Sequence, residues 1–166
     1  LSDGKRLRPI IIIDIANSIN KNLDLTKIGV SVEIIHNASL ILDDLPCMDN
    51  DEFRRGKPTI HSKYNSTIAN LASEYLLNIS FKNMFECTKE NNIDDKIFNY
   101  VLENVCYNIG IMGAAGGQII DLNPTLYLLS NIDKRREKYE ELIRKKTTSL
   151  FEMCFVSGYL YSTQKI

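Results

Sequence analysis

Apolar positions recur at helical spacing along almost the whole chain, and no segment shows the apolar-polar alternation of a half-buried strand. The pattern therefore predicts helices and no sheet. The expected long helices are Pro9 to about Asn20, Thr26 to Leu45, Ser66 or Thr67 to about Lys89, Asp94 to about Leu122, and Asp133 to about Tyr161.

Prolines and turn residues set several of these limits. Pro9 suits the first turn of a helix, and Pro46 ends the second helix because the residue before a proline avoids the helical region. Residues 46–60 form the first real break. The Asn123-Pro124 pair predicts a turn, and Thr125 to Leu129 a short helical piece after it.

Long helices favour side-by-side packing around a central space. The predicted lengths exceed the usual mean of about 11 residues, and bundles of this kind build metal and cofactor sites from side chains on facing helices. A chain of 166 residues with 44% hydrophobic residues can bury one core. We predict one all-α domain, a helical bundle around a central cavity.

Composition excludes several classes of partner. The 20 basic and 21 acidic residues nearly cancel, so no global field attracts nucleic acid. The longest apolar run, Ile10 to Ile13, is far shorter than the roughly 20 residues of a transmembrane helix. Four cysteines without a CxxC pair, together with two histidines, disfavour a zinc site or a disulfide framework. Reduced thiols suit an intracellular compartment.

The segment DDLPCMDNDEFRRGKPTIH, residues 43–61, concentrates acidic and basic side chains. Carboxylates are hard oxygen ligands for Mg²⁺, which proteins usually hold with one or two carboxylates plus phosphate oxygens, and arginine binds phosphate bidentately. One interpretation is a magnesium diphosphate site, and the other is a solvated loop whose charges pair with each other. The charged residues are Asp43, Asp44, Asp49, Asp51, Glu52, Arg54, Arg55 and Lys57.

His36 precedes this segment on the same predicted helix. His36, Leu40 and Asp43 follow at i, i+4 and i+7, so one face carries the imidazole and the first carboxylate, and Ser39 lies one turn before Asp43. Carboxylates at a helix C-terminus oppose the macrodipole by a few tenths to about 1 kcal/mol, a penalty that a bound cation would reverse. A hydrogen-bonded structural histidine is the alternative role for His36.

Three further motifs have two interpretations each. GKRLRP, residues 4–9, places basic side chains before a helix N-terminus, which suits either an anion site or a charged surface. The motif GAAGGQIIDL, residues 113–122, contains three glycines. Each glycine destabilises a helix relative to alanine by up to about 1 kcal/mol, and this cost indicates close approach by another helix or by a ligand. Gln118 and Asp121 share a face there, whereas the pair Lys146-Thr147 carries little information alone.

Together these segments resemble the trans-isoprenyl diphosphate synthases, the polyprenyl synthetase family, in its farnesyl and geranylgeranyl types. The matches follow the family order: GKRLRP at 4–9, EIIHNASLILDD and its continuation at 33–61, GGQIIDL at 116–122, and KTTSLF at 146–151. The second match is long and specific. The resemblance favours the metal-diphosphate interpretation of residues 43–57.

The resemblance implies an isoprenoid-synthase bundle, a homodimer and a head-to-tail condensation. In that reaction an allylic diphosphate ionises, its carbocation alkylates isopentenyl diphosphate, and a proton is lost. The catalyst must stabilise the leaving pyrophosphate with Mg²⁺ and shield the cation from water.

The resemblance also implies a role for each matching residue. The metal ligands of the first aspartate-rich motif are Asp43, Asp44 and Asp49, of which Asp43 and Asp44 also count as catalytic. Arg54 binds the allylic diphosphate. The isopentenyl diphosphate pocket comprises Lys5, Arg8, His36 and Arg55. The catalytic pair that faces the developing cation is Lys146 and Thr147, with Gln118 and Asp121 bordering the cavity.

Product length follows from the same resemblance. Family products grow down a tunnel floored by the residues four and five positions before the first aspartate, here Ser39 and Ala38. Both are small, whereas short-chain synthases place an aromatic residue at one or both positions. The four residues between Asp44 and Asp49 also resemble the bacterial and plant geranylgeranyl type. We expect a product of C20 or longer.

Some positions depart from the family pattern. Asp3 stands where a second glycine is common, Leu42 where a histidine is frequent, and Ser73-Glu74 where Gly-Asp is frequent. None of these removes a motif ligand, although Asp3 would weaken anion binding next to a phosphate pocket.

The family's second aspartate-rich motif would follow Lys146 by about forty residues, and no DDxxD occurs between Thr147 and Ile166. We therefore expect residues 1–166 to be a single truncated polyprenyl synthetase domain, inactive in isolation, and the full-length protein to be the synthase. A targeting segment before Leu1 would be missing, so the compartment, cytoplasm or a plastid or mitochondrial-type organelle, stays open.

Two rival functions remain. A noncatalytic subunit of a heteromeric synthase is one, but such relatives usually lose aspartates that this chain keeps. A terpene cyclase or squalene-type enzyme is the other, but it needs no acceptor site of the kind that Lys5, Arg8 and the Arg54-Arg55 pair indicate. A simple helical interaction module explains none of the four motifs.

Overall fold

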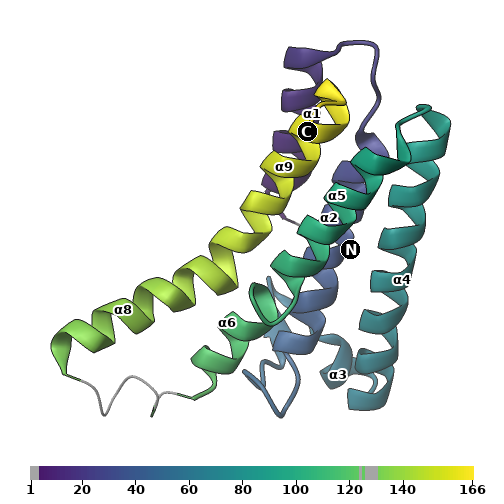
Figure 1. The fold of residues 1–166 in the computed structure, drawn as a ribbon. Coiled ribbons are helices and arrows are strands. Elements are labelled where there is room, and N and C mark those ends of the chain that lie inside the picture. The colour runs from purple at the N-terminus through teal and green to yellow at the C-terminus, as the bar shows by residue number, and fades with distance from the viewer. Residues whose placement is uncertain (1–3, 124, 126–130) are drawn as a thin grey trace.

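Figure 1 shows a computed structural model in which helices pack side by side and one short hairpin extends from them. The structure describes residues 4–123, 125 and 131–166. The all-α class predicted from the sequence is confirmed. The helices are α1 (Leu7–Ile19), α2 (Thr26–Asp43), α3 (Ile60–Lys63), α4 (Ser66–Glu90), α5 (Asp95–Ile109), α6 (Ala114–Asp121), α8 (Ile132–Ile143) and α9 (Ser149–Thr163). The segment η1 (Arg144–Thr148) is a π-helix, and the strands are β1 (Phe53–Arg54) and β2 (Lys57–Pro58).

Two predictions about these elements were wrong. The helix expected from Asp94 to Leu122 is two helices, because the chain turns at Gly110 to Gly113 and folds back on the end of α5. A Cβ on Gly113 would lie 2.0 Å from the carbonyl oxygen of Asn108, so only glycine allows this approach. The hairpin β1–β2 was also not expected, because two residues per strand are too few for an alternating pattern to appear.

Other predicted limits agree within a few residues, as at α1, α2 and α4. The last predicted helix runs through α8, η1 and α9, with the π-helical segment inside it. The short piece at Thr125 to Leu129 and the substitution at Asp3 lie outside the residues described, apart from Thr125 itself.

The core lies where α2 meets α1 and α4, and where α9 meets α1 and α5. Large apolar side chains from all five of these helices are fully buried, and each contributes roughly 1.5–3 kcal/mol by leaving water. Examples are Ile12, Ile28, Val32, Val101 and Met153. These contacts fix α2 in the bundle, and its C-terminal end lies at the site described below.

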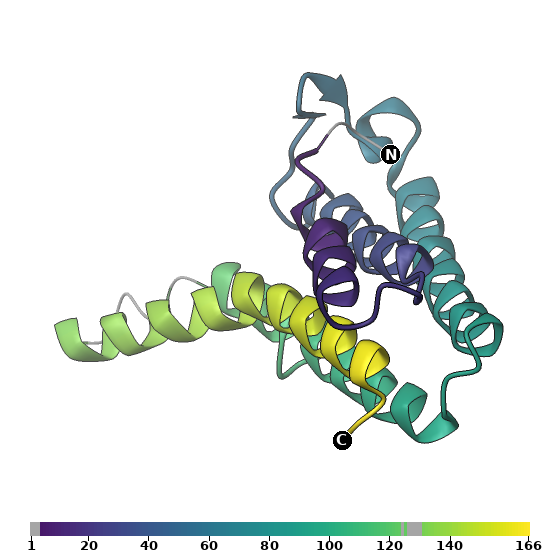
Figure 2. The ribbon, with the colours of Figure 1, turned by 90° about the horizontal axis from the view of Figure 1, so that it is seen from above.

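The α8 helix diverges from this core. Figures 1 and 2 show it directed away from the other helices, and none of its residues is buried. Its charges pair along the helix, as between Arg136 and Glu140 at 3.0 Å and between Lys138 and Glu141 at 2.7 Å. Pairs at this spacing support an exposed helix. Among the described residues, no helix is both long and apolar enough to cross a membrane.

Truncation of the core on α2 gives a test of this packing. Ile28→Ala should lower the free energy of unfolding by about 2–5 kcal/mol, because Ile28 is fully buried and its removal leaves a cavity. Val30→Ala on the same helix is the matched control, since Val30 is 41% exposed and should change stability by less than about 0.5 kcal/mol. Urea denaturation measures both, and equal effects would contradict the packing described.

Candidate functional site

A largely apolar cavity of about 520 Å³ opens beside the C-terminal half of α2. Its aliphatic lining comes from α2, α4, α6 and α9 and includes Leu40, Leu77, Ile119 and Leu150. Its polar lining is Arg8, His36, Ser39, Asp43, Ser73, Gln118, Lys146 and Thr147. We call this space the apolar cavity.

A second hollow of about 620 Å³ lies at the start of α1 and is lined by basic side chains. We call it the basic pocket. Its lining residues are Gly4, Lys5, Arg6, Leu7, Arg8, Glu33, His36 and Arg55. Arg8 and His36 line both spaces. The basic pocket and the apolar cavity therefore share a wall made of these two side chains.

Two polar atoms of this shared wall are buried and have no hydrogen-bond partner among the described residues: Nδ1 of His36 and Nε of Arg8. Buried polar atoms are usually satisfied, so the wall is suited to a ligand that accepts or donates hydrogen bonds. Burial, followed by the charge of Arg8, lowers the pKa of His36 to about 4. Burial also lowers the pKa of Arg8, whose guanidinium lies 4.8 Å from the centroid of the Phe151 ring.

The acidic residues gather where α2 ends. Asp43 is the last residue of α2 and Asp44 its C-cap, and the turn that follows returns to them because the Asp49 N–H donates to the carbonyl of Asp43 at 2.9 Å. Asp44 is 5% exposed and accepts from Arg54 at 2.5 Å. Arg54 also lies 3.4 Å from Asp51 and 4.0 Å from Asp43. The hydrogen bond with Asp44 raises the pKa of Arg54.

Lys146 reaches the same cluster from η1. Its ammonium lies 3.6 Å from a carboxylate oxygen of Asp43 and donates to Asp121 of α6. Burial opposes the charge of Lys146, but the hydrogen bond to Asp121 and the nearby Asp43 raise its pKa. Burial raises the pKa of Asp43, and Lys146 counteracts this effect. Acids from α2 and α6 thus share one lysine.

Glycine sets the distance between α6 and η1. A Cβ on Gly117 would lie 2.4 Å from the backbone nitrogen of Lys146, so the two backbones are in contact there. The π-helical segment widens the helix at this point, as is frequent at functional sites. The glycine-rich motif therefore serves close packing between helices, and that packing brings Lys146 to the cavity.

The donor chemistry of the acidic cluster fits a divalent cation. Within the described part of the chain, no three His, Cys, Asp or Glu side chains converge as a ready-made metal cage. Mg²⁺ is usually held by one or two carboxylates together with phosphate and water oxygens. Asp43 lines the apolar cavity, and Asp44 and Asp49 belong to the turn that follows it, so the three carboxylates offer ligands of this kind.

The remaining predicted residues have distinct environments. Ser39 lines the apolar cavity, whereas Ala38 is fully buried behind it and its carbonyl accepts from the Ser73 hydroxyl at 3.0 Å. Thr147 lines the cavity, and Gln118 donates to the sulfur of Met48 at 3.8 Å. Residues from all four motifs thus line the two adjoining spaces, whereas five predicted residues line neither of them: Ala38, Asp44, Asp49, Arg54 and Asp121.

Sequence reasoning missed Glu33 and Met48. Glu33 is 8% exposed, lines the basic pocket and forms an ion pair with Arg6 at 2.6 Å. Its spacing of three residues before His36 could have placed it on the same helical face. Met48 lines the apolar cavity from the turn after α2, and an isolated methionine in a loop gives no such signal.

Comparisons with known sequences point to one family. Residues 1–165 match the sequence profile described as Polyprenyl synthetase. The chain is 37% identical over 156 residues to a farnesyl diphosphate synthase of Bacillus subtilis, an alignment that covers 93% of this chain and 51% of that protein. It is 35% identical to a geranylgeranyl diphosphate synthase of Cyanophora paradoxa, with coverage of 98% and 52%. The chain spans about half the length of these curated relatives.

Comparison with solved structures supports the same family. An FPP/GFPP synthase from Zymomonas mobilis matches with a TM-score of 0.86 and 31% identity, over 99% of this chain and 58% of that one. A geranyltransferase from Helicobacter pylori matches with a TM-score of 0.84 and 31% identity, over 100% of this chain and 57% of that one.

The environment of His36 predicts its titration. Its folded pKa of about 4 lies below the ordinary value of 6.5, so the unfolded chain binds the proton more readily. Stability should therefore fall as pH decreases from about 6.5 toward 4, and should not depend on His36 above that range. NMR titration of the imidazole should give a midpoint near 4. His36→Gln should weaken the dependence of unfolding on pH in this window, and a midpoint near 6.5 would contradict the burial described.

Proposed function

The chain belongs to the polyprenyl synthetase family, and from that premise we propose that it supplies the first metal-binding half of a trans-prenyltransferase active site. The proposed reaction condenses an allylic diphosphate with isopentenyl diphosphate and yields a prenyl diphosphate of C20 or longer. The observation that carries the proposal is the wall of Arg8 and His36 between an apolar cavity and a basic pocket. Both proposed substrates are anionic, but only one has a long hydrocarbon tail. That substrate needs an apolar space, whereas the other needs mainly a basic site for its diphosphate.

The allylic diphosphate is assigned to the acidic end of α2. Asp43, Asp44 and Asp49 would hold Mg²⁺ there, and the bound ion would neutralise charge on the departing pyrophosphate. Arg54, already ion-paired with Asp44, would donate to the same diphosphate. Lys146 lies beside Asp43 and adds a cationic donor where negative charge develops.

Isopentenyl diphosphate is assigned to the basic pocket. Lys5, Arg8 and Arg55 would replace the hydration of its diphosphate with charged donors. His36 is neutral at pH 7 because of its lowered pKa, so it can hydrogen-bond without adding charge. Its place on the shared wall directs the acceptor toward the apolar cavity.

The aliphatic lining is assigned to the prenyl chain. Leu40, Leu77 and Ile119 present no group that could trap a carbocation, and they keep water from it. Thr147, Gln118 and Asp121 lie near Lys146 at the polar side, where Gln118 and Thr147 line the cavity directly. The same residues would orient the reacting carbon against the acceptor.

A homodimer is the proposed assembly. Three apolar side chains of α4 follow at helical spacing and are largely exposed, namely Ile68 at 44%, Leu71 at 57% and Tyr75 at 63%. An exposed apolar stripe of this kind is typical of a helix that packs against a partner.

Activity of the full-length protein tests the proposal. With both diphosphates and Mg²⁺, the protein should form a longer prenyl diphosphate, and chelation should abolish the reaction. Asp43→Asn should lower turnover by a factor of about 10² to 10³, because it removes a carboxylate from the metal-binding wall. Glu52→Gln is the matched control, since Glu52 is exposed in the same segment and has no assigned role.

Absence of product in the wild type, or equal activity of Asp43→Asn and Glu52→Gln, would refute the proposal. Residues 1–166 contain only the first aspartate-rich motif. We expect no turnover from this stretch alone.

Cavity size gives a separate test of product length. Among the described residues that line the apolar cavity there is no phenylalanine or tyrosine, and Ser39 is small. Ser39→Phe should shorten the main product to C15, because the ring would occupy space that the growing chain needs. Ser39→Ala should leave the length unchanged. Chromatography of the products measures both, and a C15 product from the wild type would contradict the prediction of C20 or longer.

A further inference from the structure

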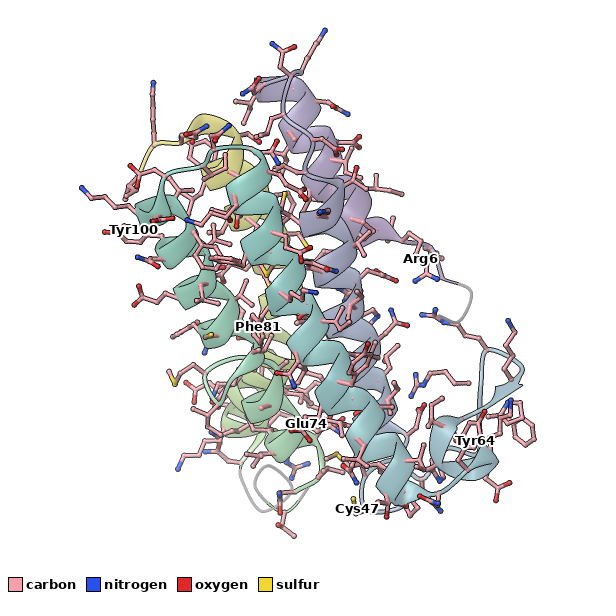
Figure 3. The ribbon with its side chains drawn as sticks, turned by 90° about the vertical axis from the view of Figure 1, so that its right-hand side faces the viewer. Arg6, Cys47, Tyr64, Glu74, Phe81 and Tyr100 are labelled. Atoms are coloured by element: carbon pink, nitrogen blue, oxygen red, sulfur yellow. The ribbon has the colours of Figure 1, made fainter. Side chains whose placement is uncertain are left out.

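The hairpin β1–β2 carries two adjacent arginines that reach different sites. Arg54 is the last residue of β1, and Arg55 follows it in the turn. Arg54 pairs with Asp44 at the end of α2. Arg55 lines the basic pocket, and its guanidinium lies over Gly4, where a Cβ would be 2.5 Å from one of its nitrogens. Figure 3 shows Arg6 and Tyr64 on the same side of α4, with the hairpin segment between them.

This hairpin is too short to hold its own shape. Each strand has two residues, paired as Phe53 with Pro58 and Arg54 with Lys57. The turn places Arg55 at φ 54° and Gly56 at φ 74°, which is the left-handed region that side chains other than glycine rarely adopt. Two-stranded hairpins are marginal in water even when longer. Contacts outside the strands must therefore fix its position.

The base of the hairpin provides such a contact. The carbonyl oxygen of Asp51 accepts two hydrogen bonds at 2.8 Å, one from the Thr59 hydroxyl and one from Nε2 of His61. The Thr59 N–H also donates to the carbonyl of Glu52 at 2.9 Å. Thr59 is 3% exposed. The chain entering β1 is thus tied to the chain leaving β2.

Hydrogen-bond chemistry defines the state of His61. A carbonyl oxygen only accepts, so Nε2 of His61 must carry the proton in this contact. His61 belongs to α3 and does not line the apolar cavity or the basic pocket. The contact with the Asp51 carbonyl links His61 to the hairpin.

We propose that His61 is a positioning residue. Together with Thr59 it fixes the hairpin, so that Arg54 and Arg55 can bind the two diphosphates at the same time. The proposal rests on the function proposed above for its effect on turnover. The proposed role of His61 differs from that of the two arginines in the number of substrates whose binding it affects. Loss of either arginine weakens one substrate, whereas loss of the His61 contact weakens both.

Kinetics of the full-length protein test this coupling. His61→Ala should raise KM for both diphosphates by about threefold to tenfold, the range expected for one hydrogen bond, with a smaller change in kcat. His61→Gln keeps an N–H donor and should restore most of the loss. Thr59→Val, which removes the second donor, should also raise both KM values. Ser62→Ala is the matched control, because Ser62 is an exposed neighbour on α3.

Limited trypsin digestion gives a readout independent of activity. Mass spectrometry should show faster cleavage after Arg54 and Arg55 in His61→Ala than in the wild type, with intermediate rates for His61→Gln and no change for Ser62→Ala. Unchanged cleavage of the hairpin would overturn the proposal, as would a rise in only one KM. If no form of the protein transfers prenyl groups, the proposed function fails, and the cleavage rates alone then decide the role of His61.

Discussion

The carboxylates at the end of α2 require positive charge, and most of the site follows from how the chain supplies it. Asp43 and Asp44 lie at the negative end of a helix dipole, and burial raises the pKa of Asp43. Arg54 compensates them from a hairpin ten residues later, and Lys146 from a helix about a hundred residues later. The two cations join the end of α2 to the hairpin and to η1.

A second constraint lies about two turns before Asp43 on the same face of α2. Arg8 and His36 leave buried polar atoms without partners, a cost that the folded chain bears in the absence of a ligand. Glu33 pairs with Arg6 nearby and reduces repulsion among the bases of the basic pocket. Helix α2 therefore carries the acids assigned to one proposed diphosphate and the neutral imidazole assigned to the other. The position of this one helix would determine how the two proposed substrates lie relative to each other.

The sequence predicted the all-α class and the limits of the longest helices, because apolar spacing and prolines act locally. It also predicted that four motifs belong to one site, since each matched a family pattern. It could not predict the break at Gly110 to Gly113 or the contact of Gly117 with Lys146, because both depend on how closely two backbones approach. Glu33 was missed although its spacing from His36 places it on the same helical face, because the ion pair with Arg6 near the start of α1 is visible only in the structure.

The backbone contact between Gly117 and Lys146 limits which residues around the apolar cavity can be substituted. The volume of the apolar cavity depends on side chains such as Ser39, Ser73 and Leu77, which belong to α2 and α4. The place of Lys146 depends on α6 and η1, where no atom can be added to Gly117 without moving the lysine. Substitutions on α2 and α4 can therefore change the volume of the apolar cavity while the backbone contact that places Lys146 stays fixed.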